Sequence, residues 1–430
     1  MRADRAYLVW LLMNGGASLS FALVFTVNAV YYVQRVGLNP LQLLLVGTAL
    51  EATVFVGEVP TGVLADTYSR RLSVIAGYVL VGAAFLVEGS VPTFGAVLLS
   101  QVLWGLGVTF TSGAAEAWIA GEIGAGRAGQ AYLRGTQAGL LGTLAGAGLS
   151  VALASARLNL PIVVGGLLFV GLAGVLAVTM REHGFRPAPA EDRPSWRVLG
   201  ATLTGSVGAV RRHPVLLTIL VIGAFYGAAS EGFDRLWQAH LLVDIALPRL
   251  GAFKLIVWFG LIGAGATLLG LGATEVVRRR VDTASHVAVA RALLAINALL
   301  VVSVVAFGLA GNFALALGAY WAASVLRTVA DPLTAAWVAQ NTGARLRATV
   351  FSLSSQANAL GQIAGGPVVG AVGTLASVRA ALAVSGLLLA PALALYARTL
   401  RRDGAPALVP DVEAEETAYA AAAPTPGAET

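Results

Sequence analysis

Long apolar segments recur along the whole 430-residue chain and constrain its fold more than any other feature. A helix needs about 20 apolar residues to cross a bilayer. Twelve segments qualify: 7–33, 40–64, 72–88, 93–118, 131–155, 161–180, 214–242, 250–274, 284–309, 313–337, 349–372 and 378–400. Only 12% of the residues are charged, against about 25% in a soluble domain. We therefore expect an all-α integral membrane protein with twelve transmembrane helices, and we exclude an ordinary soluble enzyme.

Two polar segments divide the chain. Residues 181–213 separate an N-terminal half (1–180) from a C-terminal half (214–402), with six predicted spans in each. Apolar residues recur at helical spacing in this central loop and predict a helix on the inner membrane surface: Trp196, Leu199, Leu203, Val207 and Val210. Residues 403–430 are rich in Ala, Pro and Glu, which is typical of a disordered tail.

The arginine residues indicate the orientation. With the N-terminus inside, most of them fall on the inner side, whereas the outer side holds Arg35, Arg157, Arg249 and Arg379, with Lys254 nearby. Cytoplasmic loops carry the excess of positive charge. We therefore expect both termini and the central loop in the cytoplasm and the protein in the inner (plasma) membrane. The positive charges then reflect the lipid bilayer and not a nucleic-acid partner.

Metal and cofactor chemistry finds no support in the sequence. Cysteine is absent, and His183, His213, His240 and His286 are scattered without metal-ligand spacing. No Ser/His pair or metal cluster stands at the end of a span. We therefore expect neither a metal nor a cofactor, and we do not expect an enzyme.

The two halves repeat each other. A shift of 219 residues aligns Trp118 with Trp337 and Gly142 with Gly361, and a shift of 209 aligns Asp66 with Glu275. Two parallel six-helix halves are related by an axis along the membrane normal, and such proteins place a substrate site between the halves and work by alternating access. The repeat therefore predicts two pseudo-symmetric bundles with a site at their interface.

One inner loop carries a distinctive charge pattern. Gly62, Asp66, Arg70 and Arg71 end the second span and begin the third. A carboxylate paired with an arginine at a helix junction can be stable in one state and broken in another. The corresponding loop of the other half carries Glu275, Arg279 and Arg280. We interpret these residues as an inner gate, although the arginines would also serve as simple topology signals.

This loop pattern, together with the spans and the repeat, resembles the major facilitator superfamily over residues 1–402. Ser69 and Thr67 depart from the residues usual in the family's loop. The resemblance implies a monomeric secondary transporter in which this loop stabilises the closed inner side. It also implies that spans one, four, seven and ten line the cavity.

A finer resemblance concerns residues 58–66 and 112–120, which are similar to the drug:proton antiporter branch with macrolide- and tetracycline-efflux-like members. Gln101 stands where many antiporters carry a membrane-embedded arginine, and span five lacks their Gly-Pro kink. The resemblance implies a proton-coupled exporter of amphipathic organic compounds or drugs, with small molecules and protons as its partners.

Ionisable residues inside spans are costly and are functional candidates. On span seven, Glu231, Asp234 and Arg235 share one helical face and leave one negative charge uncompensated, which could exchange a proton; a static ion cluster is the alternative. On span ten, Arg327 and Asp331 are spaced to pair, either permanently or as a switch. Near the middle of span two, Glu51 has no partner nearby in the sequence. These six residues are the predicted proton-coupling site.

Further polar and aromatic residues complete the candidate site. Glu58 and Glu116 lie near inner helix ends, where we expect them to meet loop arginines as part of the inner gate. Polar and aromatic side chains of the expected cavity helices could contact substrate or merely bridge helices: Asn14, Asn28, Gln101, Tyr226, Trp237 and Trp321.

Two other functions stay open. A nutrient symporter or an exporter of a native metabolite, such as a siderophore, would use the same fold. A channel is disfavoured by the two-half repeat and by the gate pattern.

Overall fold

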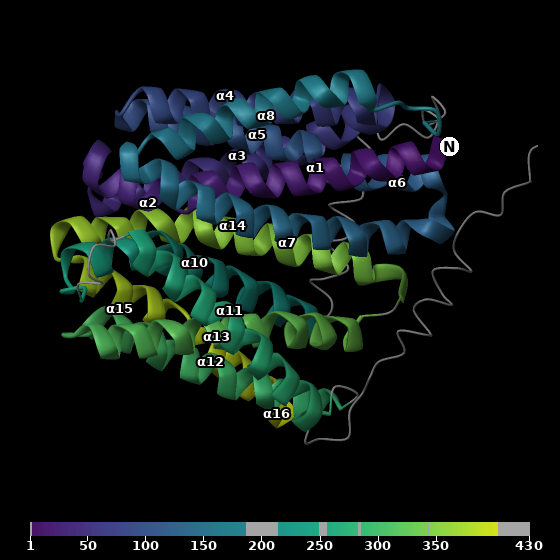
Figure 1. Ribbon diagram of the computed structural model, residues 1–430. Helices are drawn as coiled ribbons and strands as arrows, with labels where there is room; N and C mark the ends of the chain where they lie inside the picture. The colour runs from purple at the N-terminus through teal and green to yellow at the C-terminus, as the bar shows by residue number, and fades with distance from the viewer. Residues whose placement is uncertain (1, 186–213, 249–255, 283–284, 343, 403–430) are drawn as a thin grey trace, which may run out of the picture.

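The computed structural model describes residues 2–185, 214–248, 256–282, 285–342 and 344–402. Every regular element in these ranges is a helix (Figure 1). The predicted surface helix at Trp196–Val210 and the predicted tail at 403–430 lie outside the described residues, so both stay predictions.

The helices follow the predicted spans closely. Before the central loop they are α1 (Arg2–Phe25), α2 (Asn28–Tyr31), η1 (Tyr32–Val36), α3 (Pro40–Thr67), α4 (Arg70–Ser90), α5 (Phe94–Thr111), α6 (Ala114–Ile123), α7 (Ala125–Ala156) and α8 (Leu160–Thr179). After it they are α10 (Pro214–Val243), α11 (Ile256–Arg280), α12 (His286–Leu309), α13 (Phe313–Gln340), α14 (Ala344–Leu375), α15 (Val378–Leu388) and α16 (Ala390–Arg402).

Ten segments of the described chain are long and apolar enough to cross a membrane. The prediction of an all-helical, multi-pass membrane protein is therefore confirmed. The number twelve stays a prediction, because α10 and α14 are not among the ten. Each of the two carries polar groups in its interior: α10 has Glu231, Asp234 and Arg235, and α14 has Gln356, Asn358 and Gln362.

Three predicted single spans are interrupted helices. Span one breaks after Phe25, and span twelve breaks at Leu389, just before Pro391, whose ring nitrogen cannot donate to the preceding turn. Span four breaks at Gly113, which has a φ of 70°. A residue with a Cβ rarely adopts this left-handed conformation, so glycine is needed there.

Small residues allow two close helix pairs, one in each predicted half: α7 lies against α1, and α14 lies against α10. A side chain at Gly142 or Gly146 of α7 would meet the backbone of α1 at Gly15 or Leu19. The equivalent Gly361 of α14 meets the backbone of α10 at Ala224. The sequence repeat thus corresponds to the same close helix pair in both halves. Such approaches are the main source of packing between helices in lipid.

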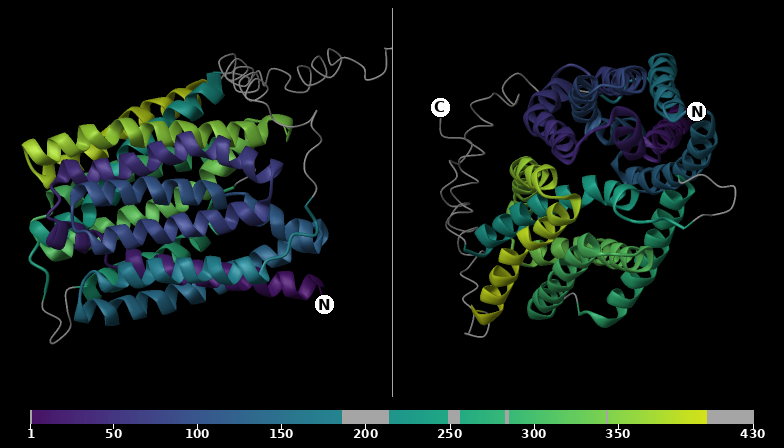
Figure 2. Two further views of the ribbon diagram at one scale, coloured as in Figure 1. Left: turned by 90° about the horizontal axis from the view of Figure 1, so that it is seen from above. Right: turned by 90° about the vertical axis from the view of Figure 1, so that its left-hand side faces the viewer.

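Helices before residue 186 pack mainly on one another, and so do those after residue 213 (Figure 2). Contacts between the two groups are made chiefly by α14 and α10 against α3. The groups are tightest where α3 begins: the Leu41 amide donates to Thr374 Oγ1 at 3.0 Å, and Gly370 lies against Leu41. In Figure 1, α12 and α16 slope away from the first group toward the end that holds the N-terminus.

We predict that Gly142→Val destabilises the protein by about 1–3 kcal/mol, because the added side chain must push α7 away from α1. Gly148→Val is the matched control, since Gly148 lies on the same helix with nothing within 4 Å of its added Cβ. Thermal denaturation of both purified variants in the same detergent would measure the difference. Equal stability of the two variants would contradict the close α1–α7 contact.

Candidate functional site

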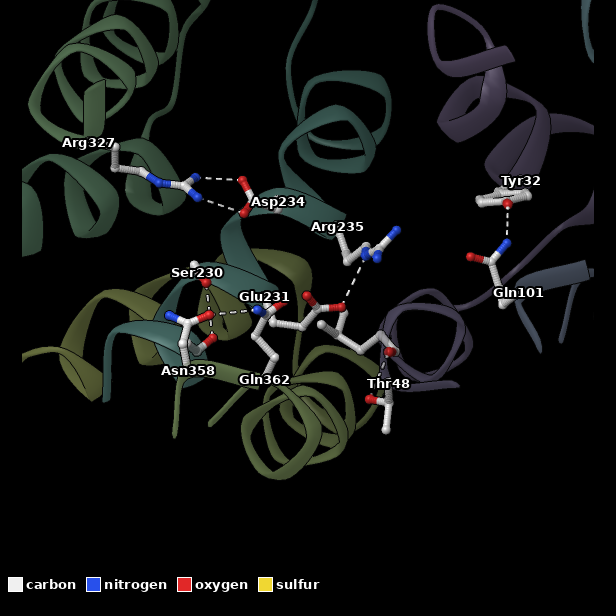
Figure 3. A network of polar contacts seen from close by, with 12 residues as sticks. Tyr32, Thr48, Gln101, Ser230, Glu231, Asp234, Arg235, Arg327, Asn358 and Gln362 are labelled. Atoms are coloured by element: carbon white, nitrogen blue, oxygen red, sulfur yellow. Dashed lines mark hydrogen bonds and ion pairs between the residues drawn. The ribbon is translucent and has the colours of Figure 1, made fainter. Parts of the chain in front are cut away.

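The charged residues of α10 form the centre of the site (Figure 3). Arg235 Nε donates to Glu231 Oε1 at 3.0 Å, one helical turn away. The Glu231 side chain is 3% exposed. A buried carboxylate of this kind needs a cation, because an unpaired charge loses its solvation.

Asp234 points away from this pair, toward α13. Arg327 Nη1 and Nη2 donate to the two Asp234 oxygens at 2.5 and 2.7 Å. The predicted Arg327–Asp331 pair is therefore wrong, and so is the prediction that span seven keeps an uncompensated charge. The reason is geometric: a carboxylate on a facing helix can meet both ends of a guanidinium at once. Tyr226 and the ring of Phe233 also contact Arg327.

The Glu231–Arg235 pair rests on a glycine of the other half. A Cβ at Gly47 of α3 would collide with the Glu231 carboxylate and the Arg235 guanidinium. Gly366 of α14 lies on another side of Glu231. The predicted proton candidate Glu51 follows Gly47 by one turn on α3, is half-buried, and lies within electrostatic range of both charges. Gly47 is not among the predicted site residues, because a lone glycine in a span carries no signal of what approaches it.

Asp331 lines a cavity of about 260 Å³ in the second group of helices. In the described part of the chain its carboxylate has no hydrogen bond or ion pair. The walls combine aromatic and aliphatic side chains, and the polar groups beside them come from three helices. Residues that line the cavity include Tyr226, Asn297, Thr334, Trp337, Phe351, Asn358 and Tyr396.

The other predicted cavity residues have structural contacts. Trp237 packs on Tyr320 with ring centres 4.5 Å apart, and Trp321 donates to the carbonyl of Ile262. Asn14 donates to the carbonyl of Trp10, one turn earlier. Of the six predicted cavity residues, Tyr226 lines the cavity described above.

A buried acid that the sequence analysis did not consider lies in the first group. Glu88, near the end of α4, is fully buried. Its carboxylate accepts from Ser100 Oγ at 2.8 Å, and Asn28 and Gln101 donate to it at 3.4 and 3.5 Å. Glu88 is the last residue of the predicted third span (72–88), whereas α4 continues to Ser90. A carboxylate inside an apolar stretch was the available signal.

The predicted inner gate ties the ends of several helices together within the first group. Asp66 and Arg70 pair at 3.1 Å. Arg70 also donates to the Ala117 carbonyl, and Arg71 donates to the carbonyls of Met180 and Ala177. Glu182, which the sequence analysis did not consider, accepts from the amides of Arg70 and Arg71 at the start of α4.

Other gate residues differ from their predicted contacts. Gly62 faces open space, so it does not serve close packing here. Glu58 and Glu116 are exposed and have no arginine partner among the described residues; Glu58 instead meets Gln356 of α14 at 3.5 Å. In the second group, Glu275 pairs with Arg278 and Arg279 of its own helix, and Arg280 is exposed.

The known proteins that are similar to this chain are membrane transporters. No family model matches the chain. It is 22% identical over 370 residues to the uncharacterized MFS-type transporter YxaM of Bacillus subtilis (strain 168). The matched region covers 83% of this chain and 86% of the relative. It is 28% identical over 127 residues to the alpha-ketoglutarate permease of the same organism, and this match covers 24% of the chain and 29% of the relative.

Solved structures show the same fold. A nucleoside transporter, NupG, has a TM-score of 0.70 at 13% identity and covers 92% of this chain and 99% of its own. A bacterial homologue of the human lysosomal transporter Spinster, in an inward-facing and unoccupied conformation, has a TM-score of 0.70 at 14% identity and covers 93% of this chain and 97% of its own. The chain is thus a multi-pass membrane protein with the fold of these transporters, and its sequence supports homology with MFS-type transporters.

We predict that Asp234→Ala and Arg327→Ala are coupled by about 0.5–3 kcal/mol in a double-mutant cycle of stability, because each removes the other's partner. Asp331→Ala and Arg327→Ala serve as the matched control and should be nearly additive. Denaturation of the six purified proteins in one detergent, the wild type and five variants, measures both cycles. Strong coupling of Arg327 to Asp331 instead would show that Arg327 pairs with Asp331, as the sequence spacing predicts.

Proposed function

We propose that this protein is a secondary active transporter that works by alternating access and exports amphipathic organic compounds in exchange for protons. The observation that carries the proposal is the cavity at Asp331, in which aromatic and aliphatic side chains surround a carboxylate without an ion-pair partner in the described residues. Such a concave, mainly apolar site with a few polar groups is typical of small-molecule binding.

The cavity favours a particular kind of molecule. Tyr226, Trp337 and Tyr396 present large apolar faces with polar edges, and such rings bind both apolar and cationic groups. Asp331 would then pair with an amine or another positive group of the substrate. An amphipathic organic cation therefore fits this site better than an anion.

Proton exchange would act on the ion pairs beside the cavity. Protonation of Glu231 would release Arg235, and loss of the Asp234–Arg327 pair would free the contact between α10 and α13. Ionisable groups inside membrane spans commonly mark proton and substrate pathways. The predicted candidates Glu231, Asp234, Arg235, Arg327, Asp331 and Glu51 thus stay the proposed coupling site.

The proposed setting is the inner membrane, with a monomer and both termini in the cytoplasm. In that orientation the contact between Leu41 and Thr374 closes the outer side. The inner ends would then be the open ones, which is the state that takes up a substrate for export. The inner gate of Asp66, Arg70 and Arg71 would change its contacts when the protein turns to the outward-open state.

A nutrient or native-metabolite transporter is the second candidate. The names of the similar proteins favour it, because they include an alpha-ketoglutarate permease and a nucleoside transporter. The charge of the cavity argues against the first of these substrates, since Asp331 would repel a dicarboxylate. A neutral or cationic metabolite would meet no such repulsion.

Inverted membrane vesicles from an efflux-deficient host would test the proposal. The vesicles are acidified inside by respiration, and a pH-sensitive dye reports proton release as each compound is added. The panel contains tetracyclines, macrolides and cationic dyes, with alpha-ketoglutarate, nucleosides and dipeptides as the metabolite arm. We expect release with cationic amphipathic compounds. Release with metabolites alone would establish the second candidate instead.

We predict that Asp331→Asn raises the half-saturating concentration of a cationic compound about 10- to 100-fold. This follows because a hydrogen bond to a charged group is worth about 1.5–3 kcal/mol and each 1.4 kcal/mol is about tenfold. Asp411→Asn, in the C-terminal tail, is the matched control. An unchanged concentration dependence in Asp331→Asn would remove Asp331 from the proposed binding site.

A further inference from the structure

Glu88 is the fully buried carboxyl group that the proposed coupling site does not use. Among the described residues, no cation lies within ion-pair distance of it. Its neighbours come from α5 (Ser100 and Gln101) and from the outer part of span one (Asn28 and Tyr32). An ionised carboxylate in such a place loses its solvation without gaining a counter-charge.

The groups around Glu88 can serve either form of the carboxyl group. Tyr32 Oη accepts from Asn28 Nδ2 at 3.1 Å and from Gln101 Nε2 at 3.2 Å, and both of these amides also donate to Glu88. The Ser100 hydroxyl also contacts the carboxyl group. Hydroxyls donate to a carboxylate and accept from a carboxylic acid by simple rotation. The network therefore permits a proton on Glu88 without rearranging the helices.

One arginine of the C-terminal half lies between this network and Glu231. In Figure 3, Arg235 stands between Glu231 on one side and Gln101 and Tyr32 on the other. Its charge acts on both Glu231 and Tyr32 and reaches Glu88. Gln101 Oε1 is buried and has no hydrogen-bond partner among the described residues. In Figure 3 this oxygen points toward the side on which Arg235 lies. A buried acceptor without a donor is costly, and a guanidinium would satisfy it.

We propose that Glu88 and Glu231 share Arg235, so that one of the two carboxyl groups carries a proton in each state of the protein. In the state seen here Arg235 pairs with Glu231, and the proton resides on Glu88. In the other state Arg235 turns to Gln101 Oε1 and to the Glu88 network, Glu88 gives up its proton, and Glu231 takes one. The site holds one anion, one cation and one neutral acid throughout.

The surrounding charges are compatible with this exchange. Glu51 on α3 also faces the Glu231–Arg235 pair, but it is only half-buried and can be solvated. Asp234 on α10 is compensated by Arg327 of α13. Near Glu88, Tyr31 donates to its backbone carbonyl at 2.8 Å, and the charge of Arg35 reaches Tyr31. None of these groups pairs with Glu88 in the described residues.

The role of this exchange in transport rests on the proposed proton coupling. Glu88 lies in the N-terminal half and Glu231 in the C-terminal half. A proton that leaves one and binds the other would make the contact between the halves depend on protonation. The chemical claim itself does not depend on any substrate, so it can fail or succeed independently of the proposed function.

Infrared spectroscopy of the purified protein in lipid nanodiscs at neutral pH would test the sharing, because a neutral carboxyl group has its own carbonyl band. We expect such a band in the wild type and its loss in Glu88→Gln. We also expect its loss in Glu231→Gln, since the released Arg235 would ionise Glu88. Arg235→Gln should keep the band and strengthen it, because neither carboxyl group then has a cation.

Three further variants control the measurement. Glu88→Asp keeps a carboxyl group and should shift the band without removing it, and a native gel-filtration profile shows that each variant folds. Glu51→Gln and Glu413→Gln should leave the band of Glu88 in place. A band that survives Glu88→Gln would show that Glu88 is not the protonated group. A band that is lost in Glu88→Gln but unchanged in Glu231→Gln would overturn the sharing of Arg235.

Discussion

The pairing of charge in an apolar interior is the constraint on which the rest of this structure depends. α10 carries Glu231, Asp234 and Arg235 near its middle, and none of them is stable there alone. Arg235 forms an ion pair with Glu231 of the same helix, and Arg327 of the neighbouring helix α13 forms one with Asp234. The second pair joins α10 to α13, and Arg327 also contacts Tyr226, which lines the cavity.

Close helix contacts make this arrangement possible. Gly47 of α3 leaves the room into which the Glu231–Arg235 pair fits, and Gly366 of α14 lets that helix approach Thr48 of α3 beside Glu231. The same small-residue packing joins α1 to α7 and α10 to α14. Glycine in this protein therefore serves two purposes: it lets helices approach, and it lets a charged pair from one half enter the surface of the other.

Much of the fold followed from the sequence, because bilayer thickness and helical rise leave few choices for a chain of this composition. The ends of α3 and α8 lie within a few residues of the predicted span ends. The site was less predictable. The presence of charges on α10 and α13 was clear, but the partner of Arg327 was not, since spacing reveals neighbours within a helix and not across helices. Glu88 was missed for the same reason: its partners lie on α5 and α2, and the apolar pattern gave only an approximate helix end.

The sequence by itself determined that the chain is a helical membrane protein with an internal repeat, because apolar length and recurring residues are local properties. Only the tertiary structure decided which charges meet. Where many antiporters of the resembled branch carry an arginine on span four, this chain has Gln101, and the structure brings Arg235 of α10 to that side instead. A counter-charge can come from any helix that packs nearby, so its source depends on how the helices assemble.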